Sequence, residues 1–143
     1  MKFKILFFIS LAVLTSCVSN SHFLLMDSTS QRWSGGIKGS GTGITYNFKV
    51  KIKSDDIEGF TKAWIGNRVA EINLKRMTLE EIDNPLSKDD IVILECRLID
   101  GDEDQMSAPI EYEGEALIEY LVGGNGRYMT VKEIEVLEKQ VNY

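Results

Sequence analysis

ITYNFKVKIK, residues 44–53, is the stretch of sequence that decides the fold. Its apolar and aromatic side chains occupy every even position from Ile44 to Ile52, and polar side chains occupy every odd position. A period of two is that of a β-strand, and it places one set of side chains in a core and the other in water. Residues 44–53 therefore predict a strand of an antiparallel sheet with one solvated face.

Similar alternation recurs on both sides of this strand. Residues 60–65 and 68–76 flank Gly66-Asn67 and predict a hairpin, and Asn125-Gly126 predicts a second tight turn. Residues 133–140 fit either a helical stripe or a strand, and their β-branched content favours a strand. About seven strands are expected in all, at residues 23–26, 44–53, 60–65, 68–76, 91–99, 113–122 and 127–131. The sequence predicts that residues 23–143 form one all-β domain, an antiparallel β-sandwich with immunoglobulin-like general architecture.

The beginning of the chain has the organisation of an export signal. Lys2 and Lys4 precede an apolar run from Ile5 to Leu14. Ten helical residues rise about 15 Å, half of a hydrocarbon core of roughly 30 Å, so this run is too short to anchor the protein. Residues 1–16 are therefore expected to be a cleaved signal peptide.

The residues that follow the apolar run, Leu14-Thr15-Ser16-Cys17, resemble a bacterial lipobox. The resemblance implies diacylglycerol on Cys17 and an added N-acyl chain such as palmitate, with residues 17–22 as the lipidated N-terminus and a short tether. Two or three acyl chains hold a protein on a membrane almost permanently. The alternative is an ordinary cleaved signal followed by a coincidental cysteine.

The glycine-rich segment and the tryptophans carry a second resemblance. Residues 33–36, 39–43 and 63–66, together with Tyr46, are similar to parts of small envelope lipoproteins of Gram-negative bacteria. This resemblance implies a location in the cell envelope, and the absence of an acidic run just after Cys17 favours the outer membrane facing the periplasm. The resemblance implies no activity. The spacing of the glycines does not fit a phosphate-binding loop, which ends in a helix.

Composition limits the partners of the mature chain. Removal of residues 1–16 leaves 127 residues with 14 basic and 22 acidic side chains, a formal charge of −8. This charge argues against nucleic acids and anionic lipid headgroups as partners. Cys96 is the one cysteine left once Cys17 is lipidated, so no intramolecular disulfide is expected, and Cys96 is predicted to be a core residue.

The acidic segment that begins at Asp100 is a candidate cation site. Asp100, Asp102, Asp104 and Glu111 stand at positions one, three, five and twelve of an EF-hand-like loop. Gln105 occupies the sixth position, where glycine is needed for the bend. The alternatives are a calcium site and a solvated acidic loop, and no cofactor is otherwise predicted.

Three functions remain open on the sequence. The leading hypothesis is a non-enzymatic binding or assembly module, fastened to the membrane through Cys17, whose partner is an envelope protein or a polymer. A glycan-binding module is the alternative, with Trp33 and Trp64 as stacking residues, although aromatic side chains beside a sheet more often lie in the core. A small hydrolase that uses the acidic loop is the third, but no catalytic pair is visible in the spacing.

Overall fold

The computed structural model describes residues 22–36, 41–76, 86–101 and 106–142. These residues form eight β-strands and no helix. The strands are β1 (Phe23–Gly35), β2 (Thr42–Ile52), β3 (Ile57–Ile65), β4 (Arg68–Arg76), β5 (Ile91–Ile99), β6 (Ala116–Val122), β7 (Asn125–Val131) and β8 (Glu135–Asn142). The all-β prediction is confirmed, and the stretch that suggested it lies in β2. The signal peptide, Cys17 and the tether up to residue 21 lie outside the described residues.

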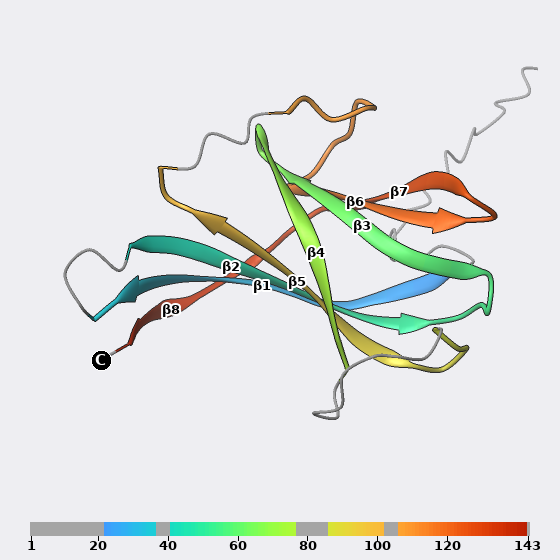
Figure 1. Ribbon diagram of the computed structural model, residues 1–143, viewed down its shortest axis with the longest axis horizontal. Helices are drawn as coiled ribbons and strands as arrows, with labels where there is room; N and C mark the ends of the chain where they lie inside the picture. Colours follow the sequence, from blue (N-terminus) through green and yellow to red (C-terminus); the bar gives the residue numbers. More distant parts are fainter. Residues whose placement is uncertain (1–21, 37–40, 77–85, 102–105, 143) are drawn as a thin grey trace, which may run out of the picture.

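All eight strands belong to one sheet, in the order β7-β6-β3-β4-β5-β2-β1-β8, which curls into a half-barrel (Figure 1). Strand β4 makes the curl. Its first half pairs with β3, as at Ala63–Ala70, and its second half pairs with β5, from Ile72–Cys96 onwards. One continuous strand therefore joins two groups of strands that cross at an angle.

This arrangement differs from the expected antiparallel sandwich in two ways. A single sheet is present where two sheets packed face to face were expected, because β4 changes partner along its length. The sheet is also mixed, since β8 runs parallel to β1. The alternation of side chains in each strand is the same for a sandwich and for a curled sheet, so it could not distinguish them. The preference for a strand near residues 133–140 is confirmed by β8.

The core fills the concave face of the half-barrel. Alternate residues of β2 and β5 lie there, including the fully buried Phe48 and Leu94. At one end Phe23 contacts Phe60 and Tyr120 edge to face, with ring centroids 5.3 and 5.0 Å apart. The whole cluster of buried residues is Phe23, Phe48, Val50, Ile52, Ile57, Ala63, Ala70, Leu86, Val92, Leu94, Cys96, Leu98, Ala116, Ile118, Tyr120, Met129 and Val131.

Cys96 belongs to this core, as predicted, with no exposed surface. Burial raises the pKa of its thiol from 9.0 to about 12. Because the unfolded chain would lose this proton first, the contribution of Cys96 to stability is complete below pH 9.0 and is lost as the pH rises towards 12.

Candidate functional site

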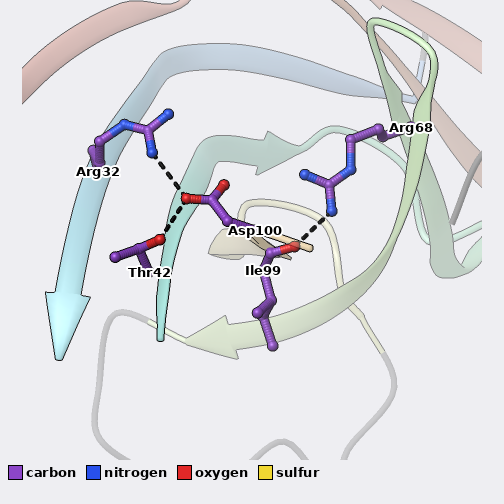
Figure 2. Close-up of polar contacts among 5 residues, drawn as sticks. All are labelled: Arg32, Thr42, Arg68, Ile99 and Asp100. Atoms are coloured by element: carbon purple, nitrogen blue, oxygen red, sulfur yellow. Dashed lines mark hydrogen bonds and ion pairs between the residues drawn. The ribbon is translucent and has the colours of Figure 1, made fainter. Parts of the chain in front are cut away.

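Asp100 follows β5 at one end of the half-barrel. Its carboxylate accepts a hydrogen bond from the hydroxyl of Thr42 at 2.6 Å and pairs with the guanidinium of Arg32 at 3.0 Å (Figure 2). The Thr42 hydroxyl and the charge of Arg32 lower the pKa of Asp100, so the contribution of its carboxylate to stability is lost as the pH falls through this lowered pKa. The carboxylate therefore connects the ends of β1, β2 and β5.

The other members of the predicted acidic site are not brought together in the described part of the chain. Glu111 is exposed in the connection between β5 and β6, whereas Asp102 and Asp104 lie outside the described residues. Among the residues that are described, no group of three His, Cys, Asp or Glu side chains could hold a metal ion. The calcium site stays a prediction.

Trp64 is a packing residue. It is 4% exposed, and its ring lies 6.1 Å from that of Tyr128 on the convex side of β3 and β7. Leu117, fully buried, is its direct neighbour on β6. A side chain so covered cannot stack on a ligand that arrives from solvent.

Trp33 lies on the convex face and is half-buried. It stands directly opposite Gly43 on β2, and a Cβ on Gly43 would lie 2.7 Å from Cζ2 of the indole. The Arg97 guanidinium covers the indole, with its carbon 4.5 Å from the ring centroid. Glycine at position 43 thus lets the indole lie against the sheet, and the indole in turn fixes Arg97.

A polar hollow of about 300 Å³ surrounds this pair of side chains. Strands β1, β2, β4, β5 and β8 line it with Gln31, Trp33, Thr45, Asn47, Lys75, Glu95, Arg97 and Gln140. Lys75 and Glu95 form an ion pair across it at 2.6 Å. The remaining groups are amides, a hydroxyl and a guanidinium, which together donate and accept hydrogen bonds over one open surface.

A second hollow, the splay hollow, begins on the other side of Arg97. It has a volume of about 450 Å³ and lies where β4 diverges from β5. Arg68 reaches across the gap and donates to the carbonyl of Ile99 at 2.8 Å (Figure 2). The lining residues are Lys62, Arg68, Val69, Ala70, Glu71, Asn73, Arg97, Leu98 and Ile99.

Arg97, Thr45 and Asn47 line the polar hollow, although nothing in the sequence pattern indicated them as site residues. The alternation placed Thr45 and Asn47 on the wet face of their strand. Only the register, with Thr45 opposite Arg97 and Gln31, brings them into one hollow with Trp33. No local signal in the sequence specifies that register.

Comparison with protein-family models, curated proteins and solved structures found no match. In the described part of the chain there is no helix with the length and apolarity to cross a membrane.

Proposed function

We propose that this protein is a lipid-anchored, non-enzymatic binding module of the bacterial cell envelope. Its signal peptide is removed before Cys17, acyl chains on Cys17 hold it to the outer membrane, and the domain faces the periplasm. The lipobox-like residues 14–17 and the short apolar run before them support the anchor. The curled sheet supports the binding role.

The observation that carries the binding role is the polar hollow around Trp33 and Arg97. The concave face is filled by the core, whereas the convex face beside Trp33 and Arg97 carries an open hollow lined by hydrogen-bonding side chains. Sites for drug-sized apolar ligands are mainly lined by apolar groups, so this hollow fits them poorly. A hydrated polymer, whose groups exchange hydrogen bonds with water for bonds to Thr45, Asn47 and Gln140, fits it better.

A glycan is the polymer that one specific observation favours. Trp33 lines the polar hollow with the Arg97 guanidinium over its indole, so a sugar that binds there meets a positioned planar cation surrounded by amide and hydroxyl groups. A hydrolase that uses the acidic loop is not favoured, because the Asp100 carboxylate already pairs with Arg32 and accepts a hydrogen bond from Thr42.

Isosteric removal of the polar groups tests this function. Thr45→Val combined with Asn47→Leu keeps the branching pattern of both side chains, but it deletes a hydroxyl and an amide from the hollow. We expect the full chain, purified in detergent, to sediment with the insoluble polymer fraction of the envelope. We expect the double variant to bind about tenfold more weakly, since each lost hydrogen bond contributes about 0.5–1.5 kcal/mol.

The control is Thr130→Val on β7, which makes the first of the two changes away from the hollow and should bind like the unaltered chain. The proposal is contradicted if the unaltered chain stays in solution, or if the double variant and the control sediment equally well.

A further inference from the structure

We infer that the polymer is an acidic saccharide and that Arg97, assisted by Lys62, binds its carboxylate at the junction of the two hollows. This inference rests on the proposed binding function and specifies the ligand class. It is carried by three features of the convex face: the fixed guanidinium of Arg97, the cationic lining of the splay hollow, and the polar lining of the hollow beside it.

Arg97 is held in place by a cation–π contact and not by an ion pair with a carboxylate of the described residues. Its guanidinium carbon lies 4.5 Å from the centroid of the Trp33 ring, and this cation–π contact restricts its position. Within residues 22–36, 41–76, 86–101 and 106–142, no carboxylate forms an ion pair with Arg97 or Lys62. A guanidinium fixed by stacking loses little side-chain freedom when it binds a carboxylate with two parallel hydrogen bonds.

The splay hollow is a consequence of the curl. The β4–β5 ladder ends at Ile72–Cys96, so Arg97 and the residues after it are paired with β2 on one side and have no paired strand on the β4 side. The space that opens there, about 450 Å³, has Lys62 and Arg97 in its lining. It is wide enough to admit a substituent of a sugar ring beside the Arg97 guanidinium.

The charge in this region is opposite to that of the protein. Three cationic side chains and one anionic side chain line the splay hollow, Lys62, Arg68 and Arg97 against Glu71. The mature chain carries a formal charge of −8, so a local excess of positive charge is not a consequence of overall composition. Such an excess attracts an anionic group and sets where it binds.

The surroundings favour a saccharide over an acidic peptide. The polar hollow adjoins the splay hollow at Arg97 and presents amide and hydroxyl groups at the spacing of neighbouring strands. Strands β1 and β2 have neighbours on both sides, and the β5 edge that β4 leaves free after Cys96 is short, with the Ile99 carbonyl already bonded to Arg68, so an extended peptide finds little strand edge on this surface. Sugar hydroxyls need no such edge.

The test uses the full chain in detergent and calorimetric titration with three probes: tetragalacturonate, its methyl ester and tetraglutamate. We expect tetragalacturonate to bind, and the methyl ester and tetraglutamate to bind at least about tenfold more weakly, because a hydrogen bond to a charged group contributes roughly 1.5–3 kcal/mol. Arg97→Met, which keeps a side chain over Trp33, should weaken tetragalacturonate binding about tenfold. Lys62→Met should weaken it about threefold, as expected for a more distant charge.

Arg127→Met on β7 is the control for the loss of one positive charge and should leave the affinity unchanged. Circular dichroism and the melting temperature establish that each variant is folded, and Lys62→Met supplies a second test that does not disturb the Trp33 stack. Equal affinity for the acid and its methyl ester, equal affinity for tetraglutamate, or an unaltered affinity in Arg97→Met overturns the inference. If the chain still sediments with envelope polymer in that case, the proposed function stands without it.

Discussion

Gly43→Ala is expected to lower the free energy of unfolding by roughly 3 kcal/mol, the upper end of the usual cost of overpacking an interior. A Cβ at this position would overlap the carbonyl oxygen of Leu98 and lie 2.7 Å from Cζ2 of Trp33. The carbonyl belongs to the β2–β5 ladder and cannot move without breaking strand pairing. For a domain of this size the melting temperature should fall by about 10 °C, which thermal unfolding followed by circular dichroism measures.

Gly59→Ala is the matched control on β3, because nothing lies within 4 Å of the added Cβ there. It should be neutral or slightly stabilising, since alanine reduces the freedom of the unfolded chain. If Gly43→Ala has the same melting temperature as Gly59→Ala, Trp33 does not pack against Gly43 of β2 as described.

Cys17→Ser is expected to release the protein from the membrane completely. The apolar run before it is too short to span a bilayer, so the proposed acyl chains are the whole attachment. Cell fractionation followed by immunoblotting measures the change, with the unaltered chain in the membrane pellet and the variant in the soluble fraction. Ser16→Ala, which keeps a small residue before the cysteine, should remain in the pellet.

The thiols provide an independent check on the same chain. With Cys17 lipidated and the Cys96 thiol buried at a pKa of about 12, native protein should not react with iodoacetamide near neutral pH. One thiol should react after unfolding in urea. A native chain with one reactive thiol, or a Cys17→Ser variant that stays in the pellet, contradicts the anchor.

Much of the fold was predictable, because the alternation of apolar and polar residues within a strand shows which of its side chains face the core. Alternation identified β2 and β5, and the Gly66-Asn67 turn identified the β3–β4 hairpin, since Gly66 adopts a φ of +63° that glycine tolerates. The burial of Cys96 was also predicted, because alternate side chains of residues 91–99 were expected to point into the core. The length of β1 was not predicted, because Trp33, Ser34 and Gly35 were assigned to a glycine-rich segment although they continue that strand.

The curl and the candidate site depend on pairings that are distant in sequence. The exchange of partners along β4, and the parallel pairing of β8 with β1, arise from packing of whole strands over a shared core. Arg97 meets Trp33 across two strand pairings. Strand register brings these distant residues together. Neither segment has a sequence feature that specifies its pairing partner.

The central claim is that the convex face beside Trp33 and Arg97 contacts the envelope partner. The most direct measurement is photocrosslinking in intact bacteria from a benzophenone amino acid at Lys49, which lies on the same face of β2 as Thr45 and Asn47, next to the polar hollow. Arg127 on β7 is the comparison position. The account predicts that position 49 becomes attached to a large envelope component and position 127 does not. Attachment from position 127 alone, or from neither position, would contradict it.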